Sequence, residues 1–348
     1  MKVLYFGIYD PNYSRNRVLI KGLKKNGVEI QELRRKPTRL SLVKLFFDYL
    51  RLRPSFDIMI VGFPGQEVMF LARFLTRKPV IFDTFTSHYG GYILDRKKYS
   101  PNSIQAKYYK LIDRWSCKLA DRCLLDTQEH INFFSERLGV PKDKFLKVFV
   151  GTDSDIFYPK VIPKDNDKFL IHFHGHFVPL QGAEYIVKAI GLLKNEDIIF
   201  QIIGRGQEYR KAKDIADQQN LNNIVWIDSV AYEDLPNYIN KADICLGGFG
   251  DTEKTKHVSM NKLFEYMACG KPIITGDSPA VREFLKDGET TVFCQRANER
   301  DLADKILSLK SNPELMNKIG LNARREFESK YTPQILAHNL LLSLEKYV

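Results

Sequence analysis

Short apolar runs alternate with amphipathic segments along the whole chain, which is the pattern of strands that alternate with helices. In the first half, the predicted strands are residues 2–8, 28–33, 57–62, 79–83, 122–126 and 147–150. In the second half, the predicted strands are residues 169–174, 198–203, 224–227, 242–246 and 273–275, and residues 300–347 are predicted to form three helices. Such alternation favours parallel sheets that are covered on both faces by helices. Because 348 residues are enough for two ordinary domains, the sequence predicts an α/β protein with two doubly wound domains.

The stretch 247–283 carries the clearest signs of a binding site. It begins with a Gly pair after an apolar strand and continues as a charged loop, a helix, a tight turn and a buried strand. Ser259 is the predicted N-cap of this helix, and the free amides near Ser259, Met260 and Asn261 are expected to face a phosphate. The ligand crevice of open α/β sheets lies at the same carboxyl end of the strands. Glu265, two turns into the helix, is expected to accept hydrogen bonds from ribose hydroxyls.

Residues 265–272, E-Y-M-A-C-G-K-P, are similar to the E-A-M-A-x-G-x-P signature of glycosyltransferase family 4. The resemblance implies the GT-B fold, with two Rossmann-like, doubly wound domains facing a central cleft. It also implies that Glu265 is the second of two family glutamates and contacts the ribose of a nucleotide-sugar donor, whereas the first falls on His257. The domains expected from it are an acceptor-side domain over 1–158, a donor-binding domain over 159–331, and a helix over 332–348 that crosses back to the first domain.

The family pattern G-R-x-x-x-x-K-G, whose Arg and Lys contact the donor diphosphate, falls on residues 175–182. His176 and Gln181 stand at the two cationic positions, so the resemblance implies that they bind the donor through hydrogen bonds. The phosphate charge is then expected to meet cations from other loops of the same half, namely Arg205, Lys254 and Lys256. A three-histidine metal site on residues 172, 174 and 176 is an alternative if the strand continues that far, although no acidic partner is near in sequence.

The first half contains two further groups of candidate residues. Arg15 and Asn16 end a polar loop after the first strand, where family members have glycines, and they are expected on the acceptor side. His88 lies between a strand end and a Gly pair, which makes it a candidate catalytic residue; an ordinary surface histidine is the alternative. Residues 151–159 resemble the hinge of the family, and the predicted linker covers 159–167.

Basic residues are concentrated in the first half of the chain. Residues 1–155 contain 28 Lys and Arg against 16 Asp and Glu, a balance of +12, and the remainder has a balance of −1. A predicted helix combines an apolar stripe with four basic residues, which is the composition of a helix in a membrane interface: Arg39, Lys44, Arg51 and Arg53. The alternative is an amphipathic helix packed on its own domain. Since the sequence contains no recognisable nucleic-acid module, the expected partners are a nucleotide-sugar donor, a glycan or lipid-linked acceptor, and an anionic membrane surface.

The resemblance implies a retaining glycosyltransferase of the hexosyltransferase type that uses a UDP-sugar or similar donor without a metal or other cofactor. Lys256 and His88 are the expected catalytic residues. A cation such as Lys256 beside the leaving diphosphate stabilises the charge that develops on it, and the resemblance implies that the loop of His88 lies near the sugar. The expected acceptor belongs to polysaccharide, lipopolysaccharide or glycolipid assembly. A sugar-nucleotide 2-epimerase-like isomerase and a non-catalytic nucleotide-sugar or glycan-binding protein are the alternatives. Five cysteines without a CxxC pair and the absence of a long apolar run favour a cytoplasmic protein, peripheral at the inner face of the membrane.

Overall fold

The computed structural model describes residues 1–164 and 168–347. The chain forms two compact units, of which the first holds residues 1–153 and 331–348 and the second holds residues 154–330. The end of the predicted linker, residues 165–167, and residue 348 of the predicted final helix lie outside the described residues.

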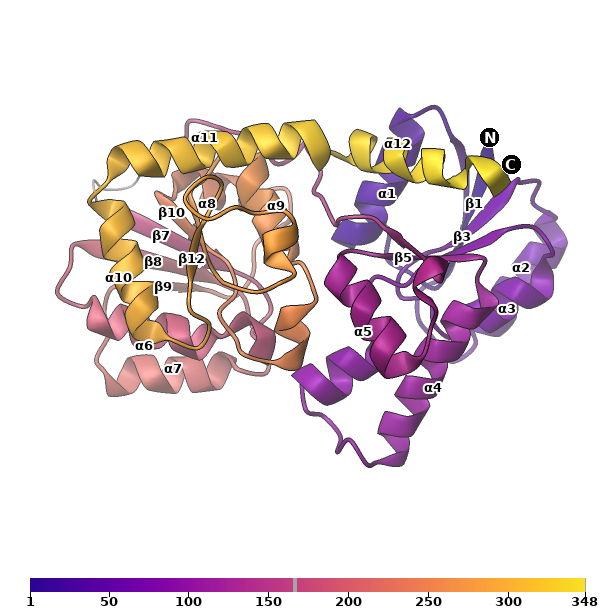
Figure 1. Ribbon diagram of the computed structural model, residues 1–348, viewed down its shortest axis with the longest axis horizontal. Helices are drawn as coiled ribbons and strands as arrows, with labels where there is room; N and C mark the ends of the chain where they lie inside the picture. The colour runs from indigo at the N-terminus through magenta and orange to yellow at the C-terminus, as the bar shows by residue number, and fades with distance from the viewer. Residues whose placement is uncertain (165–167, 348) are drawn as a thin grey trace. The chain divides into compact units, whose positions relative to one another are not determined.

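The first unit is built on a parallel sheet whose described strands follow the order β2-β1-β3-β4-β5-β6 (Figure 1). These strands are β1 (Lys2–Gly7), β2 (Glu29–Arg34), β3 (Ile58–Val61), β4 (Val80–Asp83), β5 (Arg122–Leu125) and β6 (Phe145–Lys147). From β1 the chain adds β2 on one side and then β3 on the other, so the strand order reverses between β1 and β3.

Helices cover both faces of this sheet, because successive residues of each strand point to opposite sides. In β1, Leu4 and Phe6 join the apolar cluster under the second to fifth helices, whereas Val3 and Tyr5 join the cluster under the first and last helices. The helices are α1 (Ser14–Lys25), α2 (Ser41–Leu52), α3 (Val68–Leu75), α4 (Ile104–Leu119), α5 (Gln128–Leu138) and α12 (Pro333–Leu344). The chain therefore returns to the first unit for its final helix, which packs on α1.

The second unit repeats this plan with a parallel sheet whose described strands follow the order β12-β11-β10-β7-β8-β9. They are β7 (Phe169–His174), β8 (Ile198–Ile203), β9 (Ile224–Ile227), β10 (Ile244–Leu246), β11 (Ile273–Gly276) and β12 (Val292–Cys294). From β7 the chain adds β8 and β9 on one side of the sheet, and it then adds β10, β11 and β12 on the other side. The order thus reverses between β7 and β10, and a ligand of an open α/β sheet binds outside the carboxyl ends of the strands at such a reversal.

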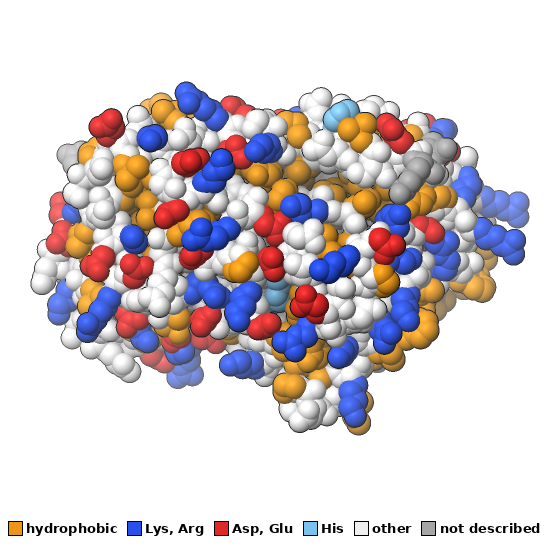
Figure 2. Space-filling model, viewed as in Figure 1, with side chains coloured by type: hydrophobic (Ala, Val, Ile, Leu, Met, Phe, Trp, Pro, Cys, Tyr) orange, Lys and Arg blue, Asp and Glu red, His pale blue; other side chains and the backbone are white. Residues whose placement is uncertain are grey.

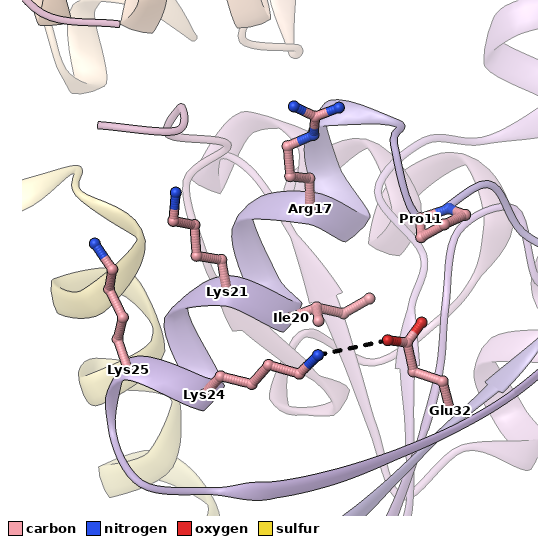
Figure 3. Close-up of a pocket in the computed structure, with 7 residues that line it drawn as sticks. All are labelled: Pro11, Arg17, Ile20, Lys21, Lys24, Lys25 and Glu32. Carbon is pink, nitrogen blue, oxygen red and sulfur yellow. Dashed lines mark ion pairs between the residues drawn. The ribbon is translucent and has the colours of Figure 1, made fainter. Parts of the chain in front are cut away.

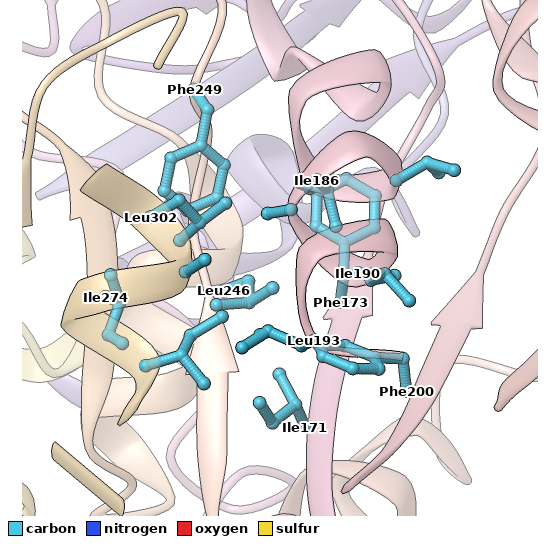
Figure 4. Packing of buried hydrophobic residues seen from close by; sticks show 14 of the residues in the cluster. Ile171, Phe173, Ile186, Ile190, Leu193, Phe200, Leu246, Phe249, Ile274 and Leu302 are labelled. Carbon is cyan, nitrogen blue, oxygen red and sulfur yellow. The ribbon is translucent and has the colours of Figure 1, made fainter. Parts of the chain in front are cut away.

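One face of this second sheet is closed by a continuous apolar core (Figure 4). Ile171 and Phe173 of β7 lie against Ile186 and Ile190, with Leu302 contributing from a later helix. The helices of this unit are α6 (Ala183–Leu192), α7 (Tyr209–Gln218), α8 (Leu235–Lys241), α9 (Asn261–Ala268), α10 (Glu299–Lys310) and α11 (Pro313–Lys330). This packing fixes the strands whose ends carry the polar residues described below.

The predicted fold class is confirmed, and β7, β8 and β9 have the predicted bounds. Two local predictions for the first unit are wrong, and one strand of the second unit was not predicted. Helix α1 begins at Ser14, so residues 15 and 16 lie in its first turn rather than in a loop. The last strand of the first unit is β6 (Phe145–Lys147) rather than residues 147–150, and β12, a short strand flanked by polar residues, has no counterpart in the sequence prediction.

Candidate functional site

Two glycine-rich loops meet at the carboxyl ends of β7 and β10. The loop after β7 contains Gly182, whose φ is +64°, and an added Cβ there would lie 2.4 Å from the backbone nitrogen of Gly250 in the loop after β10. The Phe249 amide donates a hydrogen bond of 3.0 Å to the Gln181 carbonyl. Glycine at position 182 is required both by this close approach and by the left-handed backbone. The two loops are therefore held together at the point where the strand order reverses.

Helix α9 adds a third element to the same place. Its N-cap residue is Met260, whose side chain packs so closely on Gly248 that an added Cβ would lie 2.3 Å from the methionine Cε. The prediction that Ser259 is the N-cap is therefore wrong by one residue, and Ser259 is buried. Asn261 is the first residue of the helix. The segment predicted to carry free amides, residues 259–261, thus packs on the loop after β10.

A buried chain of hydrogen bonds runs from the sheet to α9. The Gln201 side-chain amide lies 2.7 Å from His172 Nδ1, His172 Nε2 lies 2.8 Å from His174 Nδ1, and His174 Nε2 lies 2.8 Å from Glu265 Oε2. These contacts fit two neutral imidazoles that each accept at Nδ1 and donate from Nε2. The Tyr266 hydroxyl lies 3.2 Å from His174 Nδ1 and donates to the Leu246 carbonyl. The predicted ribose-binding carboxylate is consequently oriented by β7.

Lys262 is also buried beside this chain of hydrogen bonds. Its Nζ lies 3.7 Å from the centroid of the Phe173 ring and donates to the Gly247 carbonyl at 3.3 Å. The ammonium also stands beside the loop after β7, because a Cβ added at Gly175 would lie 3.1 Å from Nζ. Sequence analysis missed this residue, although its spacing of three from Glu265 on the predicted helix places both on one face.

Burial shifts the pKa values of the titratable side chains around Glu265. Desolvation raises the pKa of Glu265 to about 7, an effect that the neighbouring Lys262 partly opposes. Desolvation holds the pKa of Lys262 well below its usual range, against the opposing attraction of Glu265. The pKa values of His172 and His174 also lie well below the usual value, chiefly because both rings are buried. The site can therefore change charge when a ligand displaces solvent or brings charge of its own.

The three-histidine alternative is contradicted. Strand β7 ends at His174, and Gly175 then turns the chain with a φ of +151°, so the exposed His176 does not continue the row. His174 does have an acidic partner, Glu265, but this residue comes from a distant part of the sequence. The described part of the chain contains no cluster of three or more His, Cys, Asp or Glu side chains with metal-binding geometry.

The remaining predicted donor contacts lie in the loops after β7 and β8 and in a short helix after β10. Arg205 follows β8 and forms an ion pair with Asp228, and its loop packs on residue 177 of the loop after β7. Lys254 and Lys256 lie in the short helix η4 (Glu253–Lys256), where Lys256 is 3.6 Å from Glu253. The side-chain oxygen of Gln181 is buried with no hydrogen-bond partner among the described residues. Gln181 thus lies in the loop after β7 and Glu265 on α9, whereas Lys254 and Lys256 lie on the neighbouring segment η4.

Comparison with known proteins identifies the second unit. Residues 154–326 match the family described as glycosyl transferases group 1. The chain belongs to the group 1 glycosyltransferases. Two uncharacterized glycosyltransferases of Methanocaldococcus jannaschii are 26% identical over 236 residues and 23% identical over 304 residues, which cover 66% and 84% of this chain. These matches span 60% and 73% of the relatives' own lengths.

The structure of HepE from Anabaena in complex with UDP and glucose is similar to the whole group 1 chain. The TM-score is 0.77 with 13% sequence identity, and 99% of each chain is covered. Together with the strand orders described above, this similarity establishes the GT-B fold that the sequence resemblance implied.

In the first unit of this group 1 protein, Arg15 and Asn16 are buried and bonded internally. Arg15 forms an ion pair with Asp83, with Nη2 2.9 Å from Oδ1, and its Nη1 donates to the Val148 carbonyl at 2.7 Å. The Asn16 amide donates to the Phe63 carbonyl at 2.7 Å and accepts from the Tyr5 hydroxyl at 3.1 Å. Neither side chain is exposed to an acceptor, because both residues are 0% exposed. The placement in a polar loop was wrong, and both residues instead fix the carboxyl ends of the first sheet.

The cationic surface of α1 lies on the following turns (Figure 3). A pocket of about 420 Å³ is lined by Pro11, Arg17, Ile20, Lys21, Lys24, Lys25 and Glu32. Lys24 lies 3.6 Å from Glu32, and Lys21 forms an ion pair with Asp153. The accessible positive charge of α1 therefore lies on the turns that follow the buried Arg15.

His88 lies just before a π-helical turn, η1 (Gly90–Asp95). Its ring stacks on Tyr92 with centroids 5.7 Å apart, and its backbone amide donates to Asp113 at 3.0 Å. Asp113 also accepts from the Ser87 hydroxyl. Burial raises the pKa of Asp113, and the charge of His88 opposes this shift. The loop geometry is thus held by one buried carboxylate, and the catalytic role of His88 remains a prediction.

Proposed function

We propose that this chain is a retaining glycosyltransferase that moves a hexose from a nucleotide-sugar donor to an acceptor hydroxyl without a metal cofactor. The donor binds the second unit, and the acceptor binds the first. The observation that supports this most strongly is Glu265, a carboxylate oriented by His174 beside two glycine-rich loops at the strand-order reversal. A carboxylate suits vicinal ribose hydroxyls because it only accepts hydrogen bonds when ionised.

The proposal takes Gln181, His176, Met260, Asn261 and the residues near them as donor contacts. The roles of Arg205, Lys254, Ser259 and the catalytic role of Lys256 remain predictions from the sequence. HepE was solved with UDP, so UDP-sugars are the first donors to test.

The proposed acceptor is a lipid-linked or cell-surface glycan precursor at the cytoplasmic face of the membrane. Helix α2 buries only Ser41 and Leu45, and it exposes Phe47 to 61%. The adjacent α3 exposes Phe74 to 78%. Figure 2 shows hydrophobic and basic side chains together at the right edge of the view, where Figure 1 places these helices. Both sequence alternatives thus have support, because α2 packs on its own unit and also presents apolar and basic residues outward.

Helix α4 extends this surface with a second exposed apolar row. Its members follow the spacing of one helix face and lie beside Lys107, Lys110 and Lys118: Ile104, Tyr108, Leu111 and Trp115. No helix within residues 1–164 and 168–347 is long and apolar enough to cross a membrane. The surface of α2, α3 and α4 is therefore the proposed contact with anionic lipid.

The test begins with a thermal-shift screen against UDP, GDP, ADP and CDP. The nucleotide that stabilises the protein defines the donor series, and the matching nucleotide sugars are then incubated with membrane lipid extracts. We expect nucleotide release that depends on the extract, and an NMR spectrum in which the product keeps the anomeric configuration of the donor. Epimerisation of the donor without acceptor would indicate the isomerase alternative, and binding without release from any donor would indicate the non-catalytic alternative.

A further inference from the structure

We propose that Lys262 binds the phosphate of the ligand at the reversal between β7 and β10, and that it takes up a proton as that ligand enters. The ligand class is a nucleoside diphosphate. This inference rests on the proposed function, because it concerns the same site.

The position of Lys262 relative to both strands supports the assignment. Its Nζ contacts the Gly247 carbonyl directly after β10, and it stands beside Gly175 directly after β7. The ammonium therefore lies between the two strand ends that define the reversal of the second sheet. Ligands of open α/β sheets bind outside these ends, so an entering phosphate comes within reach of Nζ.

In the part of the chain that the structure describes, no ion pair holds the Lys262 ammonium, although Glu265, three residues further along the helix, attracts it at longer range. The residue is 4% exposed, and no carboxylate in the described chain lies within 4 Å of its Nζ. One carbonyl at 3.3 Å and the face of Phe173 are its contacts. An ammonium has three donors, and a buried cation is costly unless it is paired. A phosphate would supply the missing negative charge and further acceptors.

Two of the cations that the sequence assigned to the phosphate are already paired and more exposed than Lys262. Arg205 is paired with Asp228 and Lys256 with Glu253, and the side chains of Arg205 and Lys256 are each more than half exposed. His176 and Gln181, in the loop after β7, do not supply a fixed positive charge. Lys262 is therefore the buried cation that can compensate for these two residues, a role that the sequence assigned to Lys254 and Lys256.

Protonation follows from the groups that face Lys262. These are Glu265 on its own helix and His174 and His172 on β7, and the Gln181 side chain lies beside the same glycine, Gly175, as the Lys262 ammonium. Both histidines are held neutral, and burial favours the neutral amine of Lys262. An entering diphosphate favours the ammonium, so binding draws a proton from solvent. At pH 8, Glu265 is already largely ionised, since its pKa is about 7, and contributes little to this uptake.

Isothermal titration calorimetry at pH 8 tests the proposal with a nucleoside diphosphate and its parent nucleoside, in buffers with different ionisation enthalpies. For the wild type we expect net proton uptake with the diphosphate and none with the nucleoside. Lys262→Met should lower diphosphate affinity about 10- to 100-fold, abolish the proton uptake and leave nucleoside affinity unchanged. Lys318→Met removes an equal charge from the exposed face of α11 and should match the wild type.

Every other outcome would contradict either the assignment of Lys262 to the phosphate or the proposed function on which it rests. Unchanged diphosphate affinity in Lys262→Met would exclude the phosphate contact, and an equal loss for the nucleoside would indicate a merely structural residue. Proton uptake is measured on the wild type, so this test does not require that Lys262→Met folds. Zero uptake on diphosphate binding would contradict the coupling between binding and protonation of Lys262. A wild type that binds neither the nucleoside nor any diphosphate contradicts the proposed function itself, which is a distinct result.

Discussion

Single side chains in the second unit acquire their chemistry from burial. Glu265, His174 and Lys262 would all be ordinary ionised or titrating groups in water, yet here each is buried and shifted toward its neutral form. Such shifts support the proposal that binding and protonation are coupled at the end of β7. In contrast, the buried pair of Arg15 and Asp83 in the first unit is matched in charge and serves the fold.

Nucleoside binding should depend on pH through Glu265. The pKa of this group is about 7, so the carboxyl is neutral below that pH and ionised above it. Since the ionised form accepts stronger hydrogen bonds from ribose, nucleoside affinity should rise with pH through about 7 and then level off. His174 and Lys262 face the same carboxylate, and burial lowers the pKa of each, which favours their neutral forms.

The variant Glu265→Gln tests that dependence by calorimetry from pH 5.5 to 8.5. At pH 8.5 we expect a loss of about 1.5–3 kcal/mol in nucleoside binding, and little change with pH in the variant. Glu314→Gln on the exposed start of α11 is the matched control. A wild type with flat pH dependence, or a variant with full affinity, would remove the ribose assignment.

Replacing Arg15 should affect stability through the charge that it leaves behind. Arg15→Met strands Asp83 in a buried site without its partner, so we expect a loss of about 3–5 kcal/mol in unfolding free energy. Arg17→Met, at a partly exposed position of the same helix, should change it by less than about 0.5 kcal/mol. Urea denaturation followed by circular dichroism distinguishes the two; equal small effects would show that the buried pair does not stabilise the first unit.

Loops at the strand ends assemble the site by close backbone contact. Gly182 approaches Gly250, and Gly204 approaches the Gly175 carbonyl, where an added Cβ would lie 2.0 Å away. The loops after β7, β8 and β10 are therefore fitted to one another without side chains between them. This fit leaves the Gln181 side chain and the Lys262 ammonium beside the strand ends.

The contribution of this fit can be measured with two glycines of similar backbone. Gly182 and Gly288 have φ values of +64° and +68°, but no atom lies within 4 Å of a Cβ added at Gly288. Gly288→Ala should cost only the backbone strain, about 1–2 kcal/mol, whereas Gly182→Ala should cost about 1–3 kcal/mol more and also weaken nucleotide binding. Thermal unfolding and calorimetry on both variants provide the comparison. Equal stability losses with full nucleotide affinity would contradict the close approach.

Elements with strong periodicity were predictable from the sequence, whereas the partners of individual polar residues were not. The apolar run of β7 gave its bounds, and the E-Y-M-A-C-G-K-P segment pointed to Glu265. The bond between His174 and Glu265 joins residues 91 apart, so no local pattern contains it. Arg15 was expected on the acceptor side because it was placed in a polar loop, and only the fold reveals Asp83 as its buried partner. Lys262 was missed because a lysine next to an apolar face usually extends to solvent.

The molecule divides its charge between two units with different proposed roles. The first 155 residues carry a balance of +12, and the exposed apolar rows of α2, α3 and α4 lie in the same unit. Each basic residue near an anionic surface contributes about 1 kcal/mol, and this attraction is screened by salt. The first unit thus has both components needed for reversible attachment to lipid.

Vesicle co-sedimentation tests this attachment. We expect binding to vesicles that contain anionic lipid, a decrease at high salt, and a further decrease when the basic residues of the α2 segment are neutralised: Arg39, Lys44, Arg51 and Arg53. Neutralising four basic residues of the second unit is the control: Lys286, Lys305, Lys318 and Arg325. Equal binding to neutral vesicles, or none at low salt, would favour a soluble acceptor.

Hydrogen exchange with mass spectrometry tests the central claim, that the second unit binds a nucleoside diphosphate at the reversal between β7 and β10. The protein is compared with and without the diphosphate that gives the largest thermal shift. The account predicts slower exchange in residues 175–182, 247–250 and 259–265, and a smaller effect in Glu265→Gln at the same ligand concentration. Saturating ligand that protects only segments of the first unit, or that leaves these three segments unchanged, would contradict it.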